Sequence, residues 1–126
     1  MYSLRNIFKI FYYTYLLFLF FIYSIDINDQ TLEFYKYEEQ NIFLKNIDHF
    51  ILFFILGAVS MLINNNQNIY DKYIILTIII SILIEFIHYF LPYRGFELID
   101  FILNITGCIL GIISLYYLRK KLWKNY

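Results

Sequence analysis

The sequence is poor in the residues on which disulfide-bonded and many catalytic domains depend. Its single cysteine, Cys108, excludes an internal disulfide and a zinc cluster built on thiolates, and its place in an apolar run favours a packing role. No glycine-rich phosphate-binding loop and no G-x-S-x-G nucleophile turn is present. The formal net charge is zero, so electrostatics give no basis for nucleic-acid binding and we expect no nucleic-acid partner.

Hydrophobic residues are what the chain has in abundance. They make up 61% of the 126 residues, and aromatic residues make up 23%. The mean hydropathy of +0.60 leaves too little polar surface to cover a water-exposed domain of this length. The sequence therefore predicts an integral membrane protein, in contact with the lipid bilayer, with a single transmembrane domain over residues 1–126.

Four apolar segments approach the length of about 20 residues that a helix needs to cross a bilayer. They lie at about 7–25, 47–63, 73–91 and 98–118, and the second is a little short. Pro92 and Gly95 mark a tight turn between the last two segments, which makes those helices antiparallel neighbours. We expect an all-α bundle of four transmembrane helices.

The first segment has two features of a cleaved signal peptide, namely Arg5 and Lys9 ahead of an apolar core. Its core is long and bulky, however, and the sequence Tyr23-Ser24-Ile25 is a poor match to a small-x-small cleavage site. We therefore expect a retained membrane anchor.

Lysine and arginine placement predicts the orientation, because these residues concentrate on the cytoplasmic side. With both termini cytoplasmic, seven basic residues lie inside and three outside. The inside set is Arg5, Lys9, Lys72, Arg119, Lys120, Lys121 and Lys124, and the outside set is Lys36, Lys45 and Arg94. We expect cytoplasmic termini, an extracytoplasmic acidic loop at 26–46, and a location in the inner or plasma membrane.

Polar and ionisable residues interrupt the apolar segments at one end of this predicted bundle. His49 opens the second segment, Glu85 and His88 close the third, Arg94 lies in the turn, and Asp100 and Asn104 open the fourth. In the predicted orientation all six face the extracytoplasmic side. A charged side chain deep in a bilayer costs about 3 kcal/mol on the scale derived from membrane-insertion experiments, so Glu85 should face a partner or water rather than lipid.

Helical phase places small and polar residues on shared faces. Thr77, Ser81, Glu85 and His88 share one face of the third segment. Asp100 and Asn104 share a face of the fourth segment with Gly107 and Gly111. This glycine pair allows another helix backbone to approach closely. We expect these faces to point into the bundle.

Two interpretations of the polar cluster remain open. In the first interpretation the cluster is structural, and its polar contacts between helices hold the bundle together. The protein is then a non-enzymatic interaction or assembly module that contacts a partner through its acidic loop. In the second it is a site that binds a lipid-linked or other envelope ligand, or acts on it, because intramembrane ionisable residues are functional candidates. A small-solute transporter is disfavoured, since no internal symmetry is visible.

A metal centre is not expected from the sequence. Glu85 and His88 form the Glu-x-x-His spacing of helix-bundle di-iron sites, but such sites need a second copy and further glutamates. A two-histidine, one-carboxylate set of His49, His88 and Glu85 is conceivable. We predict neither a metal nor another cofactor.

The run from Glu85 to Gly111 resembles the VanZ-like membrane proteins. It reads E-x-x-H-Y-F-L-P-x-R, followed by Asp, Asn and two glycines at the family's spacing. The segment DHFILFFILG at 48–57 is similar to the H-F-x-x-F-x-x-L-G run of the family. The strongest match covers 48–111. His88 stands where the family commonly has glutamine, and Glu97 stands where serine is common.

The resemblance implies a four-helix membrane fold and a link to resistance against the glycopeptide teicoplanin. It carries the candidate catalytic residues His49, Glu85, Arg94 and Asp100 and the candidate binding residue Asn104, and we add His88 as a second candidate binding residue. Gly57, Gly107 and Gly111 are expected to serve helix packing. Whether the chain is an enzyme, and whether it forms oligomers, stays open.

Overall fold

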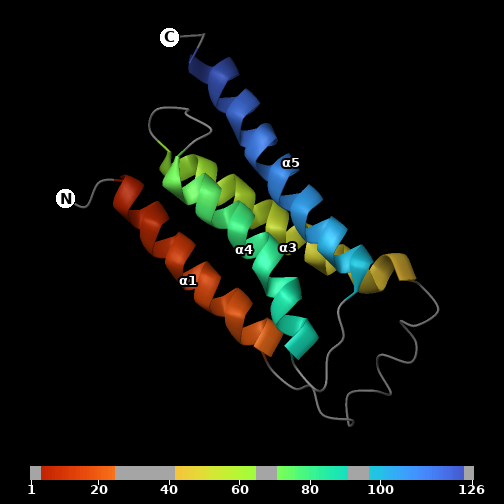
Figure 1. The fold of residues 1–126 in the computed structure, drawn as a ribbon. Helices are drawn as coiled ribbons and strands as arrows, with labels where there is room; N and C mark the ends of the chain where they lie inside the picture. The colour runs from red at the N-terminus through yellow and green to blue at the C-terminus, as the bar shows by residue number, and fades with distance from the viewer. Residues whose placement is uncertain (1–3, 25–41, 65–70, 91–96, 124–126) are drawn as a thin grey trace.

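The structure of the protein is a computed structural model, and it describes residues 4–24, 42–64, 71–90 and 97–123. These residues form four helices, namely α1 (Leu4–Ser24), α3 (Ile42–Ile63), α4 (Lys72–Phe90) and α5 (Leu98–Trp123). They run side by side as a bundle, as Figure 1 shows. The predicted turn with Pro92 and Gly95, and most of the acidic loop, lie outside the described residues.

Three helices are long and apolar enough to cross a membrane within the described part of the chain, namely α1, α4 and residues Leu98–Lys121 of α5. The apolar part of α3, Ile47–Ile63, is shorter. Helices are the natural solution for such segments, because in hydrocarbon every backbone group must be bonded within the chain. The expected all-helical membrane fold is confirmed, and α3 and α5 extend beyond their predicted bounds.

Local sequence fixes where the helices start and end. The Asp71 side chain accepts a hydrogen bond from the Tyr73 backbone N–H at 2.9 Å, which caps the start of α4. Asp100 lies in the first turn of α5, and Lys120 and Lys121 lie in its last turn. These charges complement the helix dipole at both ends.

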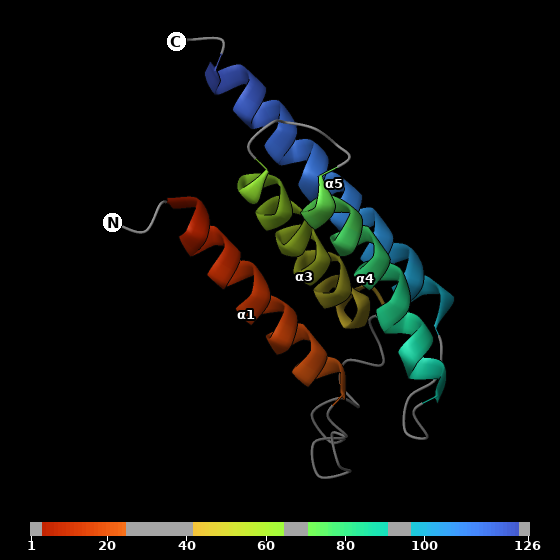
Figure 2. The same ribbon diagram turned by 60° about the vertical axis from the view of Figure 1, so that its left-hand side comes forward.

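The start of α1 and the end of α5 lie at the same end of the bundle, as seen in Figures 1 and 2. The end of α1, the end of α4 and the start of α5 lie at the opposite end, which we call the site end. The start of α1 and the end of α5 thus lie on one side of the bundle. Which side faces the cytoplasm stays a prediction.

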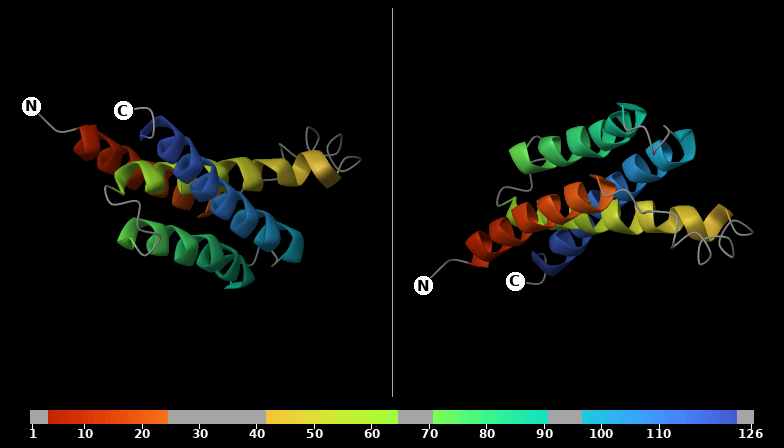
Figure 3. Two further views of the ribbon diagram at one scale, coloured as in Figure 1. Left: turned by 90° about the horizontal axis from the view of Figure 1, so that it is seen from above. Right: turned by 90° about the horizontal axis from the view of Figure 1, so that it is seen from below.

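Helix α3 is the centre of the bundle, since it contacts α1, α4 and α5. Its closest packing is against α5, which crosses it in Figure 3. The core side chains are fully or almost fully buried, and the largest are Tyr12, Leu19, Phe53, Leu56, Met61, Ile63 and Ile74. The outward faces are apolar as well, with Leu17, Phe21 and Phe90 all strongly exposed, as expected for lipid-facing helices.

Glycines set the distance between α3 and α5. A Cβ at Gly57 would collide with the Cys108 carbonyl oxygen, and one at Gly107 would collide with that of Phe50. A Cβ at Gly111 would collide with the Phe54 carbonyl oxygen in the same way. The structure thus places all three predicted packing glycines where one helix backbone touches the other.

Candidate functional site

Five of the buried polar residues gather at the site end, and they come from three helices. His49 comes from α3, Glu85 and His88 come from the last turns of α4, and Asp100 and Asn104 come from the first turns of α5. Each is at most 9% exposed, and Glu85 and Asn104 are completely buried. We call these five residues the polar cluster. Arg94, the remaining candidate, lies outside the described residues.

Packing of α3 against α5 aligns the His49 ring between two residues of α5. Its Nδ1 lies 3.1 Å from Asn104 Oδ1, and its Nε2 lies 3.6 Å from Asp100 Oδ2. Because an amide oxygen only accepts, the first contact places a proton on Nδ1. His49 is therefore oriented by Asn104, with its other nitrogen facing a carboxylate.

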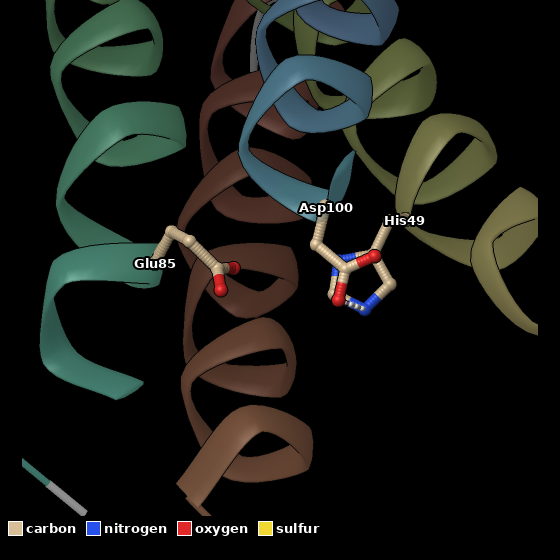
Figure 4. A group of neighbouring side chains, drawn as sticks. All are labelled: His49, Glu85 and Asp100. Atoms are coloured by element: carbon tan, nitrogen blue, oxygen red, sulfur yellow. Dashed lines mark ion pairs between the residues drawn. The ribbon is translucent and has the colours of Figure 1, made fainter. Parts of the chain in front are cut away.

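Glu85 reaches the same place from α4. Figure 4 shows its carboxylate pointing across the bundle toward Asp100 and His49. Ligand atoms of these three residues lie within 4.8 Å of one another. The Glu85 Oε1 accepts a hydrogen bond from the Glu97 backbone N–H at 3.0 Å, which links the end of α4 to the residue before α5.

His88 contacts the cluster through its own helix. Its Nδ1 lies 3.4 Å from Glu85 Oε2, one turn away on α4. The His88 side chain is buried, with only 4% exposed, yet among the described residues its Nε2 has no hydrogen-bond partner. His88 thus contacts Glu85, and it is not part of the group formed by His49, Glu85 and Asp100.

Tyr23 at the end of α1 closes the cluster, and the sequence did not reveal it. Its ring centroid lies 5.1 Å from that of His49 and 5.5 Å from that of His88. The residue is 4% exposed. One tyrosine among 14 carries no distinguishing signal, so only the fold shows that it covers both imidazoles.

The arrangement brings two carboxylates and two imidazoles together away from water. A buried carboxylate is costly unless a positive or hydrogen-bonding partner faces it. In the described part of the chain, the groups facing Glu85 and Asp100 include the imidazoles of His88 and His49. Imidazole–carboxylate pairs can hold a cation or move a proton, and both belong to ligand sites as readily as to structural networks.

Comparison with known families identifies the family of the chain. A family model described as VanZ/LLP1 matches residues 3–120, nearly the whole chain. The chain belongs to the VanZ/LLP1 family. The suspected family membership is thus confirmed, and the match extends well beyond 48–111 in both directions. Comparisons with curated proteins and with solved structures gave no match.

An apolar cavity of about 280 Å³, open toward the outside of the bundle, lies between α1 and α4. Its lining residues are all apolar, namely Leu16, Leu17, Leu19, Phe20, Ile80, Leu83, Ile84 and Ile87. Ile84 and Ile87 alternate along α4 with Glu85 and His88, and Leu19 lies one turn before Tyr23. The cavity therefore lies along apolar stretches of α1 and α4, and on α4 its lining reaches the turns that carry Glu85 and His88.

Proposed function

We propose that this VanZ/LLP1 family protein binds a lipid-linked component of the cell envelope on the extracytoplasmic side of the membrane. The polar cluster takes the head group, and the cavity between α1 and α4 takes a hydrocarbon chain. The observation that carries the proposal is that two buried members of the polar cluster, Glu85 and His88, lie on the same turns of α4 as Ile84 and Ile87, which line the apolar cavity.

The cost of burial argues against a purely structural cluster. Polar contacts between membrane helices are worth only about 0.6 kcal/mol on average, whereas a charge at bilayer depth costs about 3 kcal/mol. The glycine contacts already hold α3 against α5 without any charge. The bundle therefore does not need Glu85 and Asp100 for its packing, and this favours a role for the two carboxylates in binding a ligand.

The extracytoplasmic assignment rests on charge placement. The start of α1 and the end of α5 lie at the end away from the cluster, and Arg5, Lys9, Lys120 and Lys121 lie on these segments. Basic residues favour the cytoplasmic side, so the site end faces outward. A site there meets envelope lipids and lipid-linked precursors, and by resemblance we further propose an effect on glycopeptide susceptibility.

A substitution pair tests whether the cluster is a site. Asp100→Asn keeps the shape and removes the charge, and Asp71→Asn makes the same change at the opposite end, where asparagine still caps α4. We expect both variants to give normal yields of monodisperse protein, with teicoplanin susceptibility altered only by Asp100→Asn. A normal yield with unchanged susceptibility would contradict the resistance link, and a lost yield would favour the assembly module.

A second pair tests the cavity. Leu83→Trp adds bulk within the cavity lining, while Ile79→Trp adds the same bulk on α4 outside the lining, at a side chain of similar exposure (46% against 51%). Native mass spectrometry of the purified protein should show co-purified lipid on the wild type and on Ile79→Trp, and less on Leu83→Trp. Equal lipid on all three would remove the cavity from the proposal.

A further inference from the structure

We propose that His49, Glu85 and Asp100 bind one divalent transition-metal ion, with Zn²⁺ as the best match. Each residue comes from a different helix, and their ligand atoms lie within 4.8 Å of one another. The inference deepens the proposed function, since it names an ion that the same cluster would hold. Metal binding needs no lipid, however, so the two proposals fail in different experiments.

The spacing of the ligand atoms matches that of a coordination shell. Two ligand atoms bound tetrahedrally to zinc at about 2.1 Å lie about 3.4 Å apart. His49 Nε2 and Asp100 Oδ2 are 3.6 Å apart, too far for a good hydrogen bond but suited to a shared ion. The Glu85 carboxylate, at the end of a flexible side chain, needs to move by about 1 Å to complete the set.

His49 is held in the tautomer that a metal requires. Its Nδ1 proton is committed to Asn104 Oδ1 at 3.1 Å, so in the neutral ring the lone pair is on Nε2. That lone pair faces a carboxylate oxygen, and two electron-rich atoms at this distance need a cation between them or a second proton on the ring. Metal-bound histidines commonly donate their other ring N–H to a carbonyl in this way.

Glu85 supplies an independent indication of a ligand. Its side chain is completely buried and points toward His49 and Asp100 in Figure 4. Within the described part of the chain its Oε2 has no hydrogen-bond partner, and His88 Nδ1 lies 3.4 Å from it. A metal ion bound by this carboxylate would supply the partner that Oε2 lacks.

The donor set selects the class of ion. One imidazole nitrogen with two carboxylate oxygens suits Zn²⁺ and, less well, Mn²⁺, and it lacks the thiolates of a purely structural zinc site. Three protein ligands leave a fourth position open, where an anionic head group would bind. The sequence-based expectation of no metal considered His88 as the third ligand, whereas the fold turns His88 toward Glu85 and brings in Asp100.

The test measures metal on the full-length protein in detergent after chelator treatment. Loading with Zn²⁺ and removing excess should leave about one ion per chain by elemental analysis. Substitution with Co²⁺ should give the intense visible bands of a tetrahedral nitrogen–oxygen site. Asp100→Asn and Glu85→Gln should lose both signals, while Asp48→Asn, next to His49 but exposed, should keep them.

Two substitutions of Asn104 test whether the orientation of His49 matters for metal binding. Asn104→Asp keeps an acceptor for His49 Nδ1, whereas Asn104→Leu removes it, so only the leucine variant should bind the metal about 10–100-fold more weakly. Should the ligand variants fail to fold, the wild-type Co²⁺ spectrum decides. Its absence, or zinc binding unchanged by Asp100→Asn, overturns the inference. Lipid bound without metal would overturn the metal site and leave the proposed function standing. Metal bound without lipid would overturn the proposed function and leave the metal site standing.

Discussion

Replacing Gly111 by alanine should force α3 and α5 apart. The added Cβ would collide with the carbonyl oxygen of Phe54 and would lie 2.9 Å from the backbone nitrogen of Ala58. These are backbone atoms of a helix, so they cannot turn away as the end of a flexible side chain could. The helices themselves must therefore move.

The size of that movement sets the energetic cost. Ordinary contact begins at about 3.5 Å, so the Ala58 nitrogen must retreat by about 0.6 Å, and the Phe54 oxygen further. A gap of about 0.5–1 Å already forfeits a quarter to a half of the dispersion energy of each atom pair along the contact. Overpacking of this kind costs about 1–3 kcal/mol, which is the loss in unfolding free energy that we expect.

The assay is reversible unfolding of the purified protein in mixed detergent, followed by circular dichroism. Ile113→Phe is the matched control, because it adds a similar volume on the same helix at a side chain that is 42% exposed. Gly111→Ala should be less stable by about 1–3 kcal/mol, and the control should change little. If the alanine variant is as stable as the wild type, the close contact between α3 and α5 is refuted.

Three further predictions concern other parts of the bundle. Tyr12→Phe removes a buried hydroxyl that lies 2.8 Å from Thr77 Oγ1, and should cost about 0.5–1.5 kcal/mol in the same unfolding assay. Arg119→Leu removes the guanidinium that bonds the last carbonyls of α3, and should cost about 2 kcal/mol, whereas Lys120→Leu, at an exposed site, should cost little. A cysteine replacing Asp29 should react with a membrane-impermeant maleimide in intact cells, and protection of that cysteine would contradict the predicted orientation.

Helical phase was enough to predict which faces point inward. Glu85 and His88, with Thr77 and Ser81, were expected on one face of their helix, and all four are buried. The phase works because a membrane helix that carries a few polar groups must turn them away from lipid. Element bounds were harder, since residues 42–46, which the prediction assigned to the acidic loop, continue α3 as helix.

The partners within the site could not be read from the sequence. Phase places His49 at the correct end of α3, but the choice of Asp100 and Asn104 as its neighbours depends on how α3 crosses α5. Arg119 carried only a signal of membrane orientation, yet it bonds the carbonyl oxygen of Met61 at 2.6 Å. Such contacts arise from crossing geometry, which the periodicity of one segment does not contain.

The two halves of the bundle differ in a way that suits a binding site. On one side, backbone contact at Gly107 and Gly111 fixes α3 against α5 and thereby holds His49 beside Asp100. On the other side, α1 and α4 leave an open apolar cavity between them. In the proposed function, the contact between α3 and α5 orients the polar groups while a membrane ligand enters between α1 and α4. Gly111→Ala should consequently weaken metal binding as well as stability, because the ligands of α3 and α5 would separate together with their helices.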